Sequence, residues 1–156
     1  MRKTVIAKTE MDKKIFELAL NTDHKTLGIW AAECAERVLP YFEKKRPENM
    51  RPREAIVALR EWVRTGIFKM ASVRKYSLDA HAAARDVSED NVARSAARAA
   101  GQAMATAHVK THSIAAALYA TTVIRDATNN HEAVIKERQW QYERLVELKK
   151  NSEIRD

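Results

Sequence analysis

One segment, residues 91–124, constrains the fold of this chain more than any other. It consists almost entirely of small or apolar residues, with alanine the commonest, and its only formal charges are Arg94, Arg98 and Lys110. Alanine has the highest helix propensity and little side-chain bulk, so alanine-rich helices pack closely against their neighbours. We therefore predict an all-α fold, a single-domain bundle of five to six main helices with a central alanine-rich helix pair.

The composition supports this fold class. The chain has 156 residues, of which 46% are hydrophobic, enough for one domain with a substantial core. It contains only three glycines and three prolines, whereas a β-rich fold with many tight turns needs more of both. The single cysteine, Cys34, lies among helical neighbours, and we interpret it as a small buried hydrophobic residue.

The sequence carries no signal for secretion or for a membrane. The first residues, MRKTVIAKTEMDKK, lack the apolar core of a signal peptide. No uninterrupted apolar run reaches the ~18 residues that a membrane helix needs. One cysteine cannot form a disulfide within the chain, which suits a reducing compartment. We expect a cytoplasmic protein with no membrane partner.

We expect three parts along the chain: an N-terminal arm with a short helix (1–22), an all-α domain (23–150) and a C-terminal tail (151–156). Apolar residues at intervals of three and four indicate the helices of the domain. The expected helices span residues 24–39, 52–65, 69–86, 89–108, 112–127 and 132–149. No proline or glycine forces the break near 109–111, so one long helix through 91–124 is an alternative. In 69–86 we place Met70, Val73 and Tyr76 on the buried side.

The ends of several helices carry recognisable signals. Asp23, Ser88 and Thr111 have short side chains with an oxygen that can accept from the free amides of a helix N-terminus, so we expect them as N-caps. Gly66 fits the left-handed position that follows a helix. Pro40 is expected to end or kink the helix that begins at residue 24.

The motifs that would identify an enzyme are absent. The sequence contains no Glu-x-x-His pair for a di-iron bundle, no HExxH, no phosphate loop, no GxGxxG, no GxSxG and no Cys–His set with zinc spacing. We therefore predict no catalytic residues and no cofactor, and we expect a protein that is not an enzyme.

A pair of histidines, His108 and His112, is the only metal candidate. Four residues apart, they would share one face of a helix and could bind a transition metal. Two histidines without a placed carboxylate are a weak set of ligands. The alternative, which we favour, is a pair of structural histidines bonded to neighbouring helices.

Arg94 and Arg98 are unusual because they lie one turn apart on a helix whose other faces are alanine. Buried arginines need partners, and carboxylates are the usual ones. The expected partners are drawn from Glu33, Glu36, Asp79 and Asp86. We favour an internal ion-pair network; the alternative is an anion pocket that Arg94 and Arg98 form with His81 or His108.

A partner surface is suggested by charge. Lys and Arg number 28 against 21 Asp and Glu, a formal net charge of +7, which favours acidic partners unless it serves only solubility. Arg53, Arg60 and Arg64 share one side of their helix, opposite its apolar stripe, and Trp140 lies off the apolar stripe of the last helix. These four residues are the candidate partner-binding residues, with Trp30 and Trp62 as less exposed alternatives to Trp140. The alternatives are a solvated helix face and a tryptophan that covers an internal connection.

Three segments resemble a bacterial immunity-protein family of polymorphic toxin systems. They are DHKTLGIWAAECAERVLPYFE (23–43), RPREAIVALREWVRTG (51–66) and AARAAGQAMATAHVKTHSIAAALYA (96–120), and the resemblance covers residues 23–150. Gln102 stands where many members have histidine, which argues against histidine chemistry at that position.

The resemblance implies a small all-α protein that binds a cognate toxin domain in the cytoplasm and blocks its active site, without catalysis. Two alternatives remain open: a basic helical protein that associates with nucleic acid, and a helical protein that binds a small anion. No helix-turn-helix or RNA-binding signature supports the first of these. A homo-oligomer is compatible with all three.

Overall fold

The computed structural model describes residues 4–155, and that range contains seven α-helices and no β-strand. The helices are α1 (Asp12–Leu20), α2 (His24–Glu43), α3 (Arg51–Thr65), α4 (Met70–Arg85), α5 (Asn91–Ala105), α6 (His112–Thr128) and α7 (His131–Arg155). The all-α class is confirmed, and the number of helices exceeds the expected five to six. None of the helices in 4–155 has both the length and the apolar character that crossing a membrane requires.

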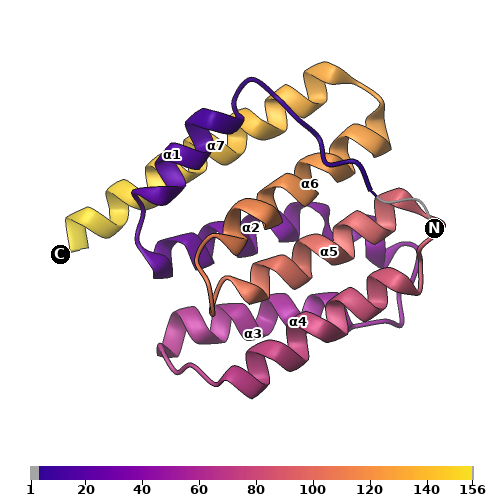
Figure 1. Ribbon diagram of the computed structural model, residues 1–156, viewed down its shortest axis with the longest axis horizontal. Coiled ribbons are helices and arrows are strands. Elements are labelled where there is room, and N and C mark those ends of the chain that lie inside the picture. Colours follow the sequence, from indigo (N-terminus) through magenta and orange to yellow (C-terminus); the bar gives the residue numbers. More distant parts are fainter. Residues whose placement is uncertain (1–3, 156) are drawn as a thin grey trace.

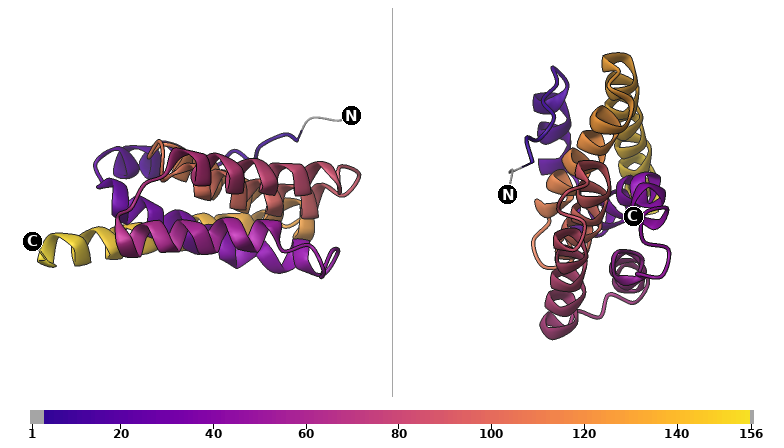
Figure 2. Two further views of the ribbon diagram at one scale, coloured as in Figure 1. Left: turned by 90° about the horizontal axis from the view of Figure 1, so that it is seen from below. Right: turned by 90° about the vertical axis from the view of Figure 1, so that its right-hand side faces the viewer.

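The helices form two layers (Figure 1, Figure 2). In one layer α4, α5 and α6 lie side by side, and in the other α3, α2 and α7 do. The short α1 lies over α7 at the edge of the bundle. The core is the surface between the layers, where alanines and a few large side chains such as Trp30, Phe42 and Leu59 are buried.

The central helix is α5, which contacts α2, α3, α4 and α6. Most of its residues are buried, and nearly all of its buried residues are small, so four helices can approach it closely. Helix α6 is its main partner, which confirms the central alanine-rich pair. The chain leaves helical structure between Ala105 and His112, so the expected break is confirmed and the single long helix is excluded.

The helix ends match the sequence signals in part. Asp23 caps α2 by accepting from the Thr26 amide at 3.0 Å, and Gly66 follows α3 with a left-handed φ of 71°. Ser88 was the wrong N-cap: Asp90, two residues later, has the extended backbone and accepts from the Ala93 amide. Thr111 precedes α6, but its backbone is helical, so its side chain does not cap the helix.

The C-terminal ends of two helices differ from expectation. Helix α2 continues through Pro40 to Glu43; the proline lies on the exposed side, where solvent can reach the carbonyl that loses its amide partner. Helix α7 runs to Arg155, so residues 151–155, expected as a C-terminal tail, are helical. Residue 156 lies outside the described residues, as do residues 1–3 of the arm.

The N-terminal arm is held against the bundle by hydrogen bonds. The Ala7 amide donates to Thr122 Oγ1 at 3.0 Å, and Arg125 Nη2 donates to the Val5 carbonyl at 2.6 Å. Arg94 also reaches the arm, donating from Nη2 to Thr4 Oγ1 at 2.9 Å. The arm is therefore tied to both central helices.

A buried polar cluster joins α1, α2, α6 and α7. Arg138, 1% exposed, donates to Gln141 Oε1 and to Asp12 Oδ1, both at 2.8 Å. The Gln141 side chain donates to the Ala117 carbonyl at 3.0 Å, and its backbone carbonyl accepts from Trp30 Nε1 at 2.9 Å. Removing one member of such a cluster leaves a buried polar group without its partner.

Candidate functional site

The arginine face of α3 is compensated by carboxylates. Arg53 forms a two-point pair with Glu43, with N–O distances of 2.7 and 2.6 Å. Arg60 forms the same kind of pair with Glu36 at 2.5 and 2.8 Å, and Arg64 pairs with Glu61 one turn earlier on α3. The three side chains lie on the surface as expected, but their charges are balanced locally, so they do not form a free cationic patch.

Trp140 lies under an arginine on the outer side of α7. The Arg37 guanidinium sits over its ring, 3.8 Å from the ring centroid. Arg37 is itself held by Glu137, which accepts from it at 2.9 and 2.8 Å. The indole is half-buried and packs against the core. The side chain is therefore covered in this state, in line with the alternative interpretation of a tryptophan that covers an internal connection.

The two histidines of the metal candidate do not share a helix face. His108 lies in the turn after α5 and stacks on Phe68, with ring centroids 6.0 Å apart. His112 is the first residue of α6, and its Nδ1 lies 2.7 Å from Gln102 Oε1. The premise of one helix through both residues is wrong. Within residues 4–155, no cluster of three or more His, Cys, Asp or Glu side chains could hold a metal ion.

Arg94 and Arg98 lack the carboxylate partners that we expected. Arg94 donates to the Ser88 carbonyl, to Asn91 Oδ1 and to Thr4 Oγ1. Arg98 Nη1 donates to His81 Nδ1 at 2.8 Å. The four expected carboxylates pair elsewhere: Glu33 with Arg144, Glu36 with Arg60, Asp79 with Lys75 and Asp86 with Arg51. Among the described residues, the expected internal ion-pair network on α5 does not exist.

The contact between Arg98 and His81 works because the histidine is neutral. Burial, with the nearby positive charges of Arg98 and Arg85, lowers the pKa of His81 to about 4. At neutral pH its Nδ1 therefore accepts a hydrogen bond from the guanidinium. Burial and the neighbouring arginines Arg85 and Arg94 also lower the pKa of Arg98. The structure thus brings together His81 and Arg98 of the predicted cluster, while Arg94 is bound to other groups.

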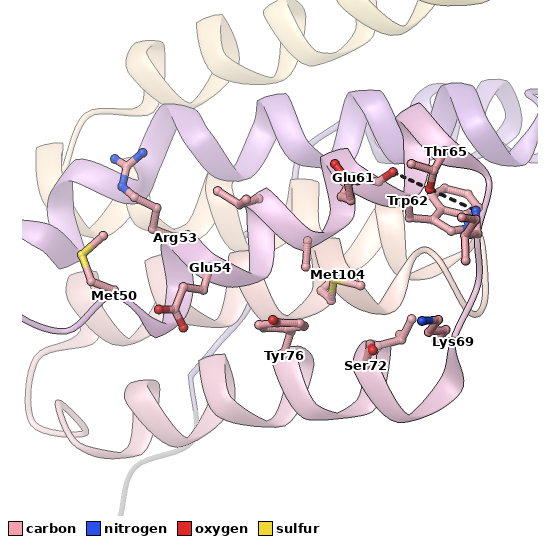
Figure 3. Close-up of a pocket in the computed structure, with 14 residues that line it drawn as sticks. Met50, Arg53, Glu54, Glu61, Trp62, Thr65, Lys69, Ser72, Tyr76 and Met104 are labelled. Carbon is pink, nitrogen blue, oxygen red and sulfur yellow. Dashed lines mark hydrogen bonds between the residues drawn. The ribbon is translucent and has the colours of Figure 1, made fainter.

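A groove lies between α3 and α4 (Figure 3). Its volume is about 710 Å³. Val57, Ala58 and Trp62 of α3 face Val73 and Tyr76 of α4 across it, with Met104 of α5 beneath. Figure 3 shows Met50, Arg53 and Glu54 at one end and Thr65, Lys69 and Ser72 at the other.

Exposed apolar side chains gather around this groove. Val57 is 59% exposed and Ile67 63% exposed, and both line it. Met50, which is 45% exposed, lines it too. A smaller hollow, which shares Val73 with the groove, is lined in part by the exposed Met70 and Leu78 of α4. Met70 was expected in the core, and the structure places it at this surface instead.

Trp62 is positioned in the groove wall by close packing of α3 on α2. A Cβ built at Gly28 would lie 2.8 Å from the Trp62 ring, so only glycine allows this approach. The His24 ring packs beside the indole, with centroids 4.9 Å apart. One part of the indole is thus fixed against α2, while the rest is available to the groove.

This groove was not among the predicted surfaces, because the candidate partner surface was chosen by charge. Val57 lies on the arginine side of α3, off the apolar stripe, and Ile67 and Phe68 fall in the connection after Gly66. Apolar residues in such places were a signal of an exposed apolar surface. The spacing between α3 and α4, which makes the surface concave, cannot be read from the sequence.

Comparison with known proteins gives one result. A family model described as Imm-5 like putative immunity protein matches residues 17–148. This range contains the groove and every candidate site residue described above. The search of curated proteins and the search of solved structures gave no match.

Proposed function

The chain belongs to the Imm-5 like putative immunity protein family, and we propose that it acts by binding a cognate toxin domain and blocking that domain's activity. The family supports a role in protein binding rather than in catalysis. We further propose that this binding takes place in the cytoplasm. The protein would then protect the cell by occupying the toxin, with no chemical step of its own.

The observation that carries this proposal is the apolar surface around the α3–α4 groove. Large exposed apolar patches on a folded domain are typical of interaction sites, because water is released when a partner covers them. Here several such side chains border a groove of about 710 Å³ with an anchored tryptophan in its wall. Tryptophan in a concave, partly apolar setting is typical of the residues that dominate binding energy.

The charge of the chain supports fast association with an acidic toxin surface. The formal net charge is +7, and long-range attraction raises the rate of encounter more than the final affinity.

The test is co-expression with the toxin domain encoded beside this gene. We expect cells that carry both proteins to grow and the two proteins to elute together in size-exclusion chromatography. Toxin alone should arrest growth, and toxin with an unrelated helical protein is the control. Arrest in the presence of this chain, with no complex, would reject the proposed function.

A further inference from the structure

We propose that the α3–α4 groove binds one amphipathic helix of the toxin, about three turns long, with a basic residue at the Glu54 end and an acidic residue at the Lys69 end. The identity of the partner rests on the proposed function. The shape and polarity of the ligand rest on the groove itself.

The length of the groove sets the length of the helix. The α3 residues that line it run from Arg53 to Thr65, twelve residues apart in sequence, which at 1.5 Å per residue is about 18 Å. A ligand helix of about twelve residues lying along the groove would match this length. One apolar face of such a helix, with anchors at intervals of three and four, is the usual ligand of a hydrophobic groove between helices.

The floor of the groove is apolar and fixed. Val73 and Met104 are buried, and Trp62 is held by Gly28 and His24 of α2. Val57 and Ile67 lie at the solvent-facing edge of the groove, and both side chains are more than half exposed. A preformed apolar floor with exposed apolar edges favours a ligand that brings its own apolar stripe, because both surfaces are then removed from water.

The two ends of the groove differ in charge. Arg53 and Glu61 also line it, but each is paired, with Glu43 and Arg64 respectively. Glu54 and Lys69 form no ion pair with any other residue in 4–155 and lie at opposite ends, as Figure 3 shows.

Lys75 is close enough to Glu54 for their charges to interact, but it is paired with Asp79 at 2.9 Å. The Glu54 end therefore keeps its negative character, and the Lys69 end keeps its positive character. A ligand of complementary polarity pairs with both free charges, whereas a ligand of the same sign at either end is repelled.

The experiment uses three labelled 15-residue helical peptides with one leucine stripe, measured by fluorescence anisotropy. The dipolar peptide has lysine at one end and glutamate at the other, and the two others have glutamate at both ends or lysine at both ends. A helix can enter a groove in either direction, so the set varies the charges at both ends rather than their order. Wild-type protein should bind the dipolar peptide tightest, by about threefold or more.

Charge variants of the protein should change this ranking in a defined way. Glu54→Lys makes both ends positive, so the peptide with two glutamates should become the tightest ligand. Lys69→Glu makes both ends negative and should favour the peptide with two lysines. The double variant restores one charge of each sign and should again favour the dipolar peptide. Glu54 and Lys69 are exposed, so circular dichroism should show folded protein in each case.

Apolar variants test the floor and edge. Val57→Asp should lower the affinity for all three peptides by about tenfold or more, because it places a charge against the leucine stripe of the peptide. Phe16→Asp is the matched control: Phe16 is a similarly exposed apolar residue on α1, away from the groove, and its loss should leave peptide binding unchanged.

Any one of three peptide results would overturn the inference. They are no saturable binding of any peptide to wild type, peptide affinities of Val57→Asp equal to those of wild type, and an order of peptide affinities that does not change in the charge variants. Sedimentation that shows a dimer dispersed by Val57→Asp would also overturn it, since a second copy would then occupy the groove. If no peptide binds but the protein still protects cells from the toxin, this inference alone is rejected. If the peptides bind but the protein does not protect cells from the toxin, the proposed function is rejected and the groove remains a helix-binding site.

Discussion

The ring of His81 on α4 lies so close to Gly101 on α5 that a Cβ at residue 101 would approach His81 Nε2 to 2.7 Å. The other ring nitrogen accepts from Arg98, which fixes the ring in this position. Next to this contact, the Ser77 hydroxyl donates to the Gly101 carbonyl at 3.0 Å. Glycine is therefore required on α5 because of the histidine that faces it.

Gly101→Ala should destabilise the protein, although alanine is the better helix former. The added methyl group forces the His81 ring and α4 to move, at a cost of about 1–3 kcal/mol. In a His81→Ala background the space is open, and Gly101→Ala should become neutral or stabilise by up to about 1 kcal/mol. Urea denaturation of the four proteins measures this reversal of sign. An equal loss in both backgrounds would show that the ring is not the obstacle.

Stability should fall as the pH is lowered from 6.5 to about 4, in part through His81. Its folded pKa is about 4, below the ordinary 6.5, so the unfolded chain binds a proton first in this window and gains free energy from doing so. We expect a loss of about 2 kcal/mol from this residue, allowing for solvent that reaches the ring. The loss should be complete below pH 4.

His81→Gln is the informative variant for this pH effect, because its amide oxygen can still accept from Arg98 but does not titrate. Its stability curve between pH 4 and 6.5 should be flatter than that of wild type. His112 also has a pKa lowered by burial and by His108, so His112→Gln is measured in parallel. Curves of equal slope for wild type and His81→Gln would contradict the buried neutral histidine.

Removing Asp12 alone should destabilise the protein more than removing Asp12 and Arg138 together, because the single change leaves a buried charge unpaired. Burial raises the pKa of Asp12, but hydrogen bonds from Arg138 and Thr9 bring it below its ordinary value, so the aspartate is ionised. Asp12→Ala leaves the fully buried Arg138 guanidinium without its carboxylate and should cost about 2–4 kcal/mol. Adding Arg138→Met should recover part of this loss, because it removes the unpaired charge but also removes the donor to Gln141 Oε1. A double variant no more stable than Asp12→Ala would contradict the argument; thermal unfolding of both decides it.

Nucleic-acid binding should be absent despite the net charge. The arginines of α3 are paired with Glu43, Glu36 and Glu61, so this helix presents no stripe of uncompensated positive charge to a phosphate backbone. Labelled single-stranded and duplex DNA should give no anisotropy change at low salt. A change that weakens steeply with salt and disappears in Arg60→Ala would support the nucleic-acid alternative instead.

Much of the fold could be predicted from the sequence because local signals agree with the packing. Alanine content placed the central pair, and Asp23 and Gly66 set the ends of their helices. The signals failed where two neighbouring side chains could each serve as the N-cap, as with Ser88 and Asp90 before α5. They also failed at Pro40, where the cost of a proline depended on which side of α2 it occupied.

The candidate site was harder to predict because it depends on pairing across helices. The sequence shows that Arg53 and Arg60 share a face, but it does not show that Glu43 and Glu36 of another helix neutralise them. Arg98 illustrates the opposite case: a carboxylate partner was expected, and a neutral histidine from α4 takes its place. Charge patterns along one helix therefore gave candidate surfaces, and the neighbouring helices decided which charges stayed free.

Isothermal titration calorimetry of the toxin domain with wild type, Val57→Asp and Phe16→Asp shows whether the α3–α4 groove holds the toxin. We expect wild type and Phe16→Asp to bind with equal affinity and Val57→Asp to bind about tenfold or more weakly. Equal affinity of all three proteins, or no binding by wild type, would contradict an immunity protein that holds its toxin in the α3–α4 groove.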